Sequence, residues 1–510
     1  MNLSTPADLN TLKYLNNALM DKLGKMSNST VDTETLGNGA ITVVQNIGSM
    51  GGFSPTLIVL VPMGAMNETP EQLGLAHVVE HFVFKGMKEF SARELLLNAE
   101  NMSIEMNAAT SKWFTMFYGT FPEAVFEKAV NFMADLVYNP SFPERELEKE
   151  LKVVISELNS SFADMGMLIS LLFERIQFGN APLGRSVGAC PSNIEKLTKQ
   201  DITEFYKKYY KPENMIISVS GNLPENATSI VKNAFKTDVR SDSKMLSMLN
   251  PFIPEYTSDE RYIWVKRPLD QSGLMYGVRS VPPNHELRFS FDIAAKILGS
   301  GLSSILFTVL REENGLVYSA QATTDLMPKC GFFIIKTMCN PNDTFKVLNK
   351  IKECIKMLYD VKESDIIKAK NSILSKILSM STASGPMAKR NMEEYMISNG
   401  KIPSLYETAE KIGSVNKESI RKVAEHLLKS STIWVGVGNP GELENKLPLE
   451  YLLNPKDVFC NKNLNLVRSV QNDQIDLSSI IRLISLDMNN PLVVNEGVEE
   501  EENHPTEFLF

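Results

Sequence analysis

Apolar and polar residues alternate in two separate parts of the chain, and each part predicts a sheet with helices beside it. In the first part, strands are expected at 40–47, 56–64, 103–110 and 114–121, with helices between and after them. In the second part, a strand at 273–280 precedes helices at 291–299 and 302–314 and strands at 316–324 and 331–339. Strands grouped with helices, without strict alternation of the two, are typical of α+β layers.

A pattern of helix followed by strand occurs twice at nearly constant spacing. Residues 194–222 and 409–439 each contain a helix start, a helix and a β-branched strand that ends in Gly-Asn. Matching positions lie 217 residues apart (Gly221 and Gly438) or 218 residues apart. One shared offset indicates a duplicated domain. The alternative is a chance match, since a helix followed by a strand is common.

The duplication divides the chain into two related domains. We expect an N-terminal domain over 1–240, a linker over 241–260, a related C-terminal domain over 261–460 and an extension over 461–510. The predicted fold class is α+β, with two homologous domains that each pack a mostly antiparallel sheet against helices. The extension ends in EGVEEEENHPTEFLF, which is typical of a solvated acidic tail. The alternative for this tail is a partner-binding role.

Charge and hydropathy exclude several functional classes. The 510 residues carry a net charge of -9 and no basic stripe, which argues against nucleic-acid binding. The longest strongly apolar run, TLIVLVPMGAM at 56–66, is too short to span a bilayer and contains a proline. We therefore expect no nucleic-acid partner and no membrane insertion.

The cysteines and the N-terminal sequence favour a cytoplasmic location. The five cysteines are scattered and form no C-x-x-C pair, which is typical of a reducing compartment rather than of a disulfide framework. The first residues contain no secretory apolar core. No arginine precedes Arg93, which argues against a mitochondrial signal.

The stretch LAHVVEHFVF places three ionisable residues in an otherwise apolar helix, predicted over about 74–85. His77, Glu80 and His81 fall at i, i+3 and i+4, so they share one helix face. Burying such groups is costly unless they are paired or bound to a metal. Histidines at i and i+4 can bind one Zn²⁺, and the glutamate can take a proton from a water molecule there. The alternative is a core helix whose histidines bond to backbone carbonyls.

A third ligand is expected from the glutamate-rich helix predicted at 143–161. Most of its acids are best explained as a solvated face, namely Glu144, Glu146 and Glu148. Glu157 differs because its sequence neighbours are mostly apolar, and Glu150, two turns earlier, points in nearly the same direction. A carboxylate at the edge of an apolar face needs a partner, and zinc supplies one.

These residues resemble a known peptidase family. H-x-x-E-H is the inverzincin signature, and the 75 residues between His81 and Glu157 match the spacing in the pitrilysin, insulysin and mitochondrial processing peptidase family. Three further stretches are similar to motifs of that family: NAATSKWFT at 107–115, ELKVVISEL at 150–158 and ILGSGLSSILFTVLREENGLVY at 297–318. The resemblance covers most of residues 35–445.

The resemblance implies a role for each residue of the zinc motif. His77, His81 and Glu157 correspond to the zinc ligands, and Glu80 corresponds to the general base. Glu150 corresponds to a second acid that helps to hold the site.

The resemblance also implies substrate-binding residues. Arg311 and Tyr318 correspond to a pair that binds the substrate backbone and stabilises the tetrahedral oxyanion; the alternative is a helix C-terminal charge and a strand aromatic. Asn107 and Ala108 would lie on an edge strand to which an extended peptide adds. Trp113 stands where many relatives carry a glutamate.

The expected function is that of a zinc metalloendopeptidase that hydrolyses extended peptides or unfolded polypeptide segments. The resembling family encloses its substrate in a chamber of four such domains, so a chain with two implies a homodimer. The alternatives are a catalytically inactive structural or assembly subunit of the same fold and a regulatory peptide-binding partner.

Overall fold

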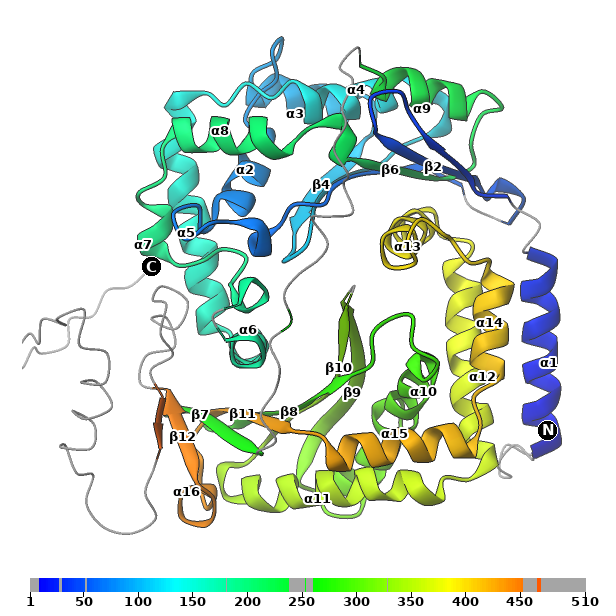
Figure 1. Cartoon of the computed structure of the whole chain (residues 1–510), viewed down its shortest axis with the longest axis vertical. Helices are drawn as coiled ribbons and strands as arrows, with labels where there is room; N and C mark the ends of the chain where they lie inside the picture. Colours follow the sequence, from blue (N-terminus) through cyan, green and yellow to red (C-terminus); the bar gives the residue numbers. More distant parts are fainter. Residues whose placement is uncertain are drawn as a thin grey trace, which may run out of the picture.

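The computed structural model describes residues 9–26, 30–50, 53–179, 181–237, 253, 260–327, 329–452 and 466–468. They form two β-sheets with helices packed around them (Figure 1), so the predicted α+β fold class is confirmed. Most of the predicted linker and of the predicted extension, including its acidic tail, lies outside the described residues.

The first sheet ends in a strand that carries two of the predicted site residues. Its strands are β1 (Asp32–Thr35), β2 (Ile41–Asn46), β3 (Thr56–Val61), β4 (Glu105–Thr110), β5 (Thr115–Thr120) and β6 (Ile216–Gly221). Their order is β1-β2-β6-β3-β5-β4, and only β2 and β6 run parallel. The central strands β3 and β6 are buried at every position, which explains their unbroken apolar character.

The second sheet repeats this plan. Its strands are β7 (Arg261–Lys266), β8 (Ser272–Ser280), β9 (Val317–Met327), β10 (Cys330–Cys339), β11 (Thr432–Gly438), β12 (Leu449–Leu452) and β13 (Leu466–Arg468). Their order is β13-β12-β7-β11-β8-β10-β9. The run β7-β11-β8-β10-β9 matches β2-β6-β3-β5-β4, and each run begins with one parallel pair. The predicted duplication is therefore present in the topology.

The two segments that indicated the duplication occupy corresponding places. They contain α8 (Lys199–Tyr209) before β6 and α15 (Lys417–Lys429) before β11. Both strands end in a glycine with positive φ, +152° at Gly221 and +128° at Gly438. A Cβ atom at Gly221 would lie 2.5 Å from Cα of Pro55, so the strand end requires glycine in this close approach.

Helices also correspond between the halves. The pairs are α2 (Leu75–Val83) with α10 (Arg288–Gly299), α4 (Phe126–Tyr138) with α11 (Thr344–Met357), α5 (Leu147–Ala163) with α12 (Glu363–Met380), and α6 (Met165–Phe178) with α13 (Ser384–Ile397). One predicted helix differs, because the segment at 302–314 contains a π-helical turn at Phe307–Glu312.

The halves interlock through α6 and α13. Helix α6 packs on β8 and β11 of the second sheet, and α13 packs on β3 and β6 of the first. Ser218 of β6 donates a hydrogen bond to the carbonyl of Ala388 (2.8 Å), and Arg279 of β8 donates one to the carbonyl of Gln177 (2.8 Å). Each half thus covers part of the other half's sheet.

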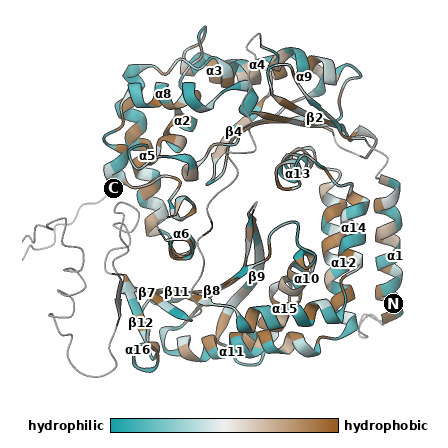
Figure 2. Ribbon diagram, in the orientation of Figure 1, coloured by the Kyte–Doolittle hydropathy of each residue, from teal (hydrophilic) through white to brown (hydrophobic). Residues whose placement is uncertain are grey.

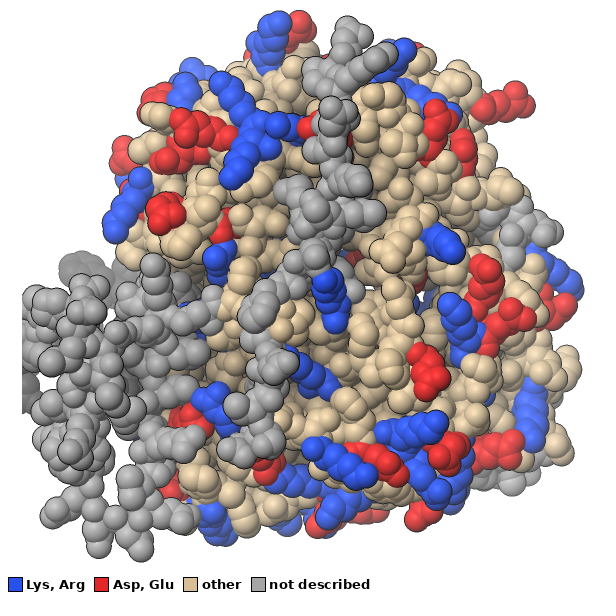
Figure 3. Space-filling model, in the orientation of Figure 1, with Lys and Arg blue, Asp and Glu red and all other residues tan. Residues whose placement is uncertain are grey.

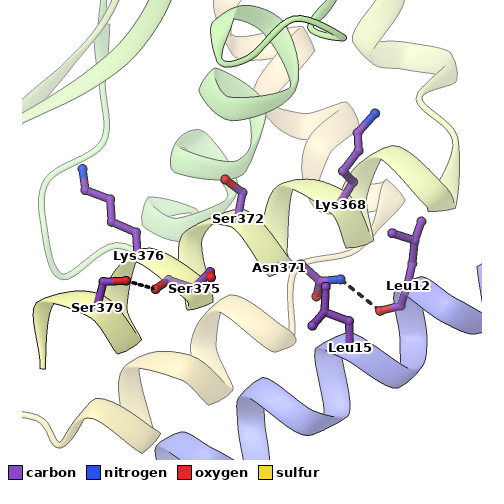
Figure 4. A pocket seen from close by; sticks show the side chains of 8 residues that line it. All are labelled: Leu12, Leu15, Lys368, Asn371, Ser372, Ser375, Lys376 and Ser379. Carbon is purple, nitrogen blue, oxygen red and sulfur yellow. Dashed lines mark hydrogen bonds between the residues drawn. The ribbon is translucent and has the colours of Figure 1, made fainter. Parts of the chain in front are cut away.

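Helix α1 (Leu9–Met26) joins the N-terminal part of the chain to the second half. It packs against α12 and α14 (Leu405–Gly413). Asn371 of α12 donates a hydrogen bond to the carbonyl of Leu12 (2.9 Å) (Figure 4), and Leu23 is fully buried. Leu15 and Lys368, labelled in Figure 4, are among the residues that line an open groove of about 500 Å³ between α1 and α12.

The surface shows no extended region of one charge on the face drawn in Figure 3, where Lys and Arg alternate with Asp and Glu. Figure 2 shows β2 as largely hydrophobic, whereas α11 and α12 alternate between hydrophobic and hydrophilic residues, as helices with one buried face do. Within the described residues, no helix is both long enough and apolar enough to cross a membrane.

One prediction about the cysteines is wrong. Cys330, Cys339 and Cys354 are free, buried thiols, but Cys190 is disulfide-bonded. Spacing along the chain does not reveal which cysteines the fold brings together, so the scattered pattern did not exclude a disulfide. The cysteine pattern accordingly gives no support to a reducing compartment.

Candidate metal centre

Helix α2 has one polar face, and its other positions are apolar and buried. The buried residues are Leu75, Ala76, Val78, Val79, Phe82 and Val83. The helix packs against α5, α8, β4 and β5, and these side chains contribute to the core of the first half. The remaining face carries His77, Glu80 and His81, each partly buried.

Helix α5 brings Glu157 to the two histidines. The Nε2 atoms of His77 and His81 lie 3.3 Å apart, and Oε2 of Glu157 lies 3.7 Å from the first and 3.5 Å from the second. Among the described residues, these three form the one group of at least three His, Cys, Asp or Glu side chains able to share a metal ion. In the part of the chain that the structure describes, no hydrogen bond joins the ring of His77 or of His81 to a backbone carbonyl.

The donor atoms fit zinc. Two neutral imidazole nitrogens that face each other at 3.3 Å repel unless a proton or a cation lies between them. Two histidine nitrogens and one carboxylate are ligands of a catalytic zinc site, which keeps a fourth position open. The residues that could hold the ion are therefore His77, His81 and Glu157.

Glu150 fixes the orientation of the His81 ring through the Nδ1 atom. It is 3% exposed, and its Oε1 lies 2.8 Å from Nδ1 of His81. Nζ of Lys85 lies 2.6 Å from its other oxygen. The carboxylate thus accepts a hydrogen bond from Nδ1–H, which turns Nε2 of His81 toward Glu157 and His77. Glu150 thus lies directly beside His81, one of the three expected ligands.

Electrostatics in the metal-free site favour a cation among these groups. Burial, and then the neighbouring His81, lower the pKa of His77 to about 4. Burial acts to lower the pKa of His81, but hydrogen bonds with Glu150 and Glu157 outweigh it and raise the pKa to about 9. The hydrogen bond with His81 also holds the pKa of Glu157 below its usual value. A proton on His81 therefore supplies the positive charge that a metal ion would bring.

Glu80 lies on the same helix face as the two histidines. Thr110 of β4 donates a hydrogen bond to its Oε2, which fixes the carboxylate against the edge strand. Burial raises the pKa of Glu80, and the bond from Thr110 opposes this shift. A carboxylate with a raised pKa is suited to accept and return a proton near neutral pH.

Strand β4 lies at the edge of the first sheet. In the described part of the chain it pairs only with β5, so its other backbone edge is open. Asn107 is exposed and Ala108 is partly buried, and Oδ1 of Asn107 accepts a hydrogen bond from the Ala108 backbone N–H (2.8 Å). Trp113 lies in the turn between β4 and β5 and is partly buried.

Arg311 and Tyr318 form a pair of their own in the second half. The Arg311 guanidinium lies 4.7 Å from the centre of the Tyr318 ring and donates a hydrogen bond to the Tyr318 carbonyl (2.9 Å). The Tyr318 side chain is 78% exposed. Within the described residues, no hydrogen bond, ion pair or ring contact joins this pair to His77, His81, Glu80 or Glu157.

Two residues of this site were not predicted from the sequence. Lys85 follows His81 by four residues, so helix periodicity could have placed it on the same face. Thr110 had no such signal, because only the packing of β4 against α2 brings it to Glu80.

Comparison with family models covers both halves of the chain. Residues 53–191 match the model described as Insulinase (Peptidase family M16), and residues 196–373 match the model described as Peptidase M16 inactive domain. The zinc motif therefore lies in the region of the first model, and Arg311 and Tyr318 lie in the region of the second.

Known proteins are similar over most of the chain. A Streptomyces coelicolor protein named an uncharacterized zinc protease is 26% identical over 411 residues, covering 79% of this chain and 89% of its own. A Bacillus subtilis protein with a similar name is 25% identical, covering 77% and 94%. The crystal structure of a protease from Helicobacter pylori shares the fold, with a TM-score of 0.72 at 21% identity, covering 80% and 99%.

Proposed function

Because the chain belongs to the M16 (pitrilysin-type) peptidase family, in its two-domain form, we propose that it is a zinc-dependent endopeptidase. Its substrates are extended peptides or unfolded polypeptide segments that add to the open edge of β4. The observation that carries the proposal is the cluster of His77, His81 and Glu157 with Glu80 on the same helix face.

Each residue near this cluster has a separate task in the proposed reaction. Zinc bound by the three donors would lower the pKa of a water molecule and polarise the peptide carbonyl. Glu80 would take a proton from that water and pass it to the leaving amine. Thr110 holds the Glu80 carboxylate in place, and Glu150 fixes the ring of His81.

The proposed active site is completed by a second copy of the chain. Tyr318 is 78% exposed and Leu302, in the segment before the π-helical turn, is 76% exposed. Arg311 and Tyr318 are thus free to meet another molecule, whereas they do not contact the zinc cluster of their own chain. In a homodimer, the pair would bind the substrate backbone and the developing oxyanion at the partner's zinc site.

Cleavage of a library of quenched fluorescent peptides by the purified full chain tests this function. We expect hydrolysis that stops when a zinc chelator is added and returns when zinc is restored. Mapping of the cut sites would then define the side chains preferred at the cleaved bond. A zinc-loaded, folded chain that cleaves no peptide would instead support the structural or assembly subunit.

A further inference from the structure

We propose that Glu68 is a positioning residue, which holds the zinc-site helix α2 in the orientation needed by His77 and Glu80. Glu68 lies in the loop before the helix and is 2% exposed. Its Oε2 accepts a hydrogen bond from the Gly74 backbone N–H (2.9 Å), and its Oε1 accepts one from the Ala76 backbone N–H (2.8 Å). The inference rests on the proposed function, because it concerns the same metal site.

Helix α2 has no cap from its own first residues. Gly74 precedes it with φ +90° and supplies no side chain. A Cβ atom at this position would lie 2.4 Å from Cδ1 of Ile194, so a capping side chain does not fit there. By contrast, the neighbouring helix α3 (Ala92–Asn101) is capped locally by Ser91 and Glu94. Glu68, which lies six residues before Gly74, therefore takes the place of the missing local cap.

The Glu68 backbone is itself held in place. Arg185 donates hydrogen bonds to the carbonyls of Glu68 and Met66, and its own carbonyl accepts one from Nζ of Lys112 (3.0 Å). Lys112 belongs to the turn between β4 and β5. This chain of contacts connects the start of the metal-binding helix to the hairpin that would hold the substrate.

A buried carboxylate is costly to retain unless it is fully hydrogen-bonded. Burial raises the pKa of Glu68 to about 8, against the opposing effect of its bonds with Ala76 and Gly74. The hydrogen bond from the Ala76 N–H holds the residue directly before His77 in place. Loss of the cap would therefore displace the first turn of α2 and with it the first histidine.

Zinc affinity, measured by competition with a chromogenic chelator, tests the inference on the full chain. Glu68→Gln keeps the shape but presents an amide NH₂ to one of the two backbone N–H groups. We expect its zinc dissociation constant to rise about tenfold or more, as other residues that orient metal ligands do. The control is Glu94→Ala, which removes the side chain that accepts hydrogen bonds from Ser91 at the start of α3. It should lower the melting temperature while changing zinc affinity by less than about twofold.

The outcomes separate this inference from the proposed function. If the wild-type chain binds no zinc, the proposed function fails and the inference fails with it. If the wild type binds zinc and Glu68→Gln binds it within about twofold as tightly, only the inference is overturned, whatever happens to the melting temperature. Should Glu68→Gln not fold, Glu68→Asp decides by the same criterion, because it keeps the carboxyl group but is too short to reach both N–H groups. In peptide cleavage, Glu68→Gln should lower kcat more than it changes KM.

Discussion

Helices α2 and α10 occupy corresponding places in the two halves, but their polar groups differ. Each follows the third strand of its sheet run and precedes the edge strand, and each packs on the corresponding long helix, α5 or α12. Where α2 and α5 gather two histidines and two glutamates, α10 and α12 bring together Lys296 and Lys376. Burial and then the charge of Lys376 lower the pKa of Lys296. Two cations cannot provide a metal site, so the proposed metal site belongs to one half of the duplicated scaffold.

One contact is common to both halves. Thr110 of β4 donates a hydrogen bond to Glu80 of α2, and Thr324 of β9 donates one to Asp292 of α10. Burial raises the pKa of both acids. Because only Glu80 lies beside the proposed metal site, we expect Glu80, and not Asp292, to act as a base.

The largest expected effect comes from removing that base. Glu80→Gln should retain zinc and peptide binding but lose about 10²- to 10⁴-fold in kcat, because only proton transfer is removed. The matched control is Asp292→Asn, which alters the corresponding contact in the second half and should leave kcat nearly unchanged. Peptide-cleavage kinetics on zinc-loaded samples measures both. Equal losses in the two variants would show that the contact is structural in both halves.

Mixed dimers test whether the two halves cooperate between chains. Glu80→Gln and Tyr318→Phe homodimers should each be strongly impaired. A mixed dimer pairs an intact Glu80 with an intact Tyr318 at one site, so activity should recover to about half of the wild-type value if the sites are independent. Co-expression with two tags, tandem purification and a cleavage assay measure this recovery. An assembly in which both groups act within one chain would show no recovery.

Loss of the group that orients His81 should have an intermediate effect. Glu150→Gln removes the carboxylate that binds Nδ1 of His81, so the zinc dissociation constant should rise about 10- to 100-fold. Glu148→Gln, on the exposed face of the same helix, is the control and should bind zinc normally. Chelator competition measures both variants. Unchanged affinity in Glu150→Gln would mean that Glu157 and His77 suffice to orient the site.

The smallest predicted effect is that of a change of one pH unit on zinc binding. His81 has a pKa of about 9 in the metal-free chain and must lose its proton to bind the ion, whereas His77, with a pKa of about 4, is already neutral. Zinc affinity should therefore rise about tenfold per pH unit from about pH 6 to 8 and level off above about 9. Calorimetry in buffers of different ionisation enthalpy should find about one proton released. Release of no proton near pH 7 would contradict the raised pKa of His81.

The local parts of this fold and site could be predicted from the sequence. Helix periodicity placed His77, Glu80 and His81 on one face. The apolar neighbours of Glu157 distinguished it from Glu148, although 53% of the Glu157 side chain is exposed. Strand alternation, and for β3 an unbroken apolar run, located β2, β3, β4 and β5 to within a few residues. These patterns are set by residues near one another in the chain, so a local reading captures them.

Contacts between distant residues could not be predicted in this way. Glu68 reads as an ordinary loop acid until the fold buries it against the N–H groups of α2. Strand β7 was not predicted, because its short run directly follows the linker and its pairing with β11 joins residues far apart. Helix α6 packs on the second sheet and α13 packs on the first. Periodicity within one helix shows which face is buried, but it does not show which sheet that face contacts.

Zinc content is the most direct test of the claim that one half carries the metal site. Elemental analysis of the purified full chain should find about one zinc per chain, and His77→Ala with His81→Ala should reduce it to nearly none while the fold is retained. Lys296→Ala with Lys376→Ala, in the second half, should leave about one zinc per chain. Stoichiometric zinc in the histidine variant, or none in the wild type, would contradict the account.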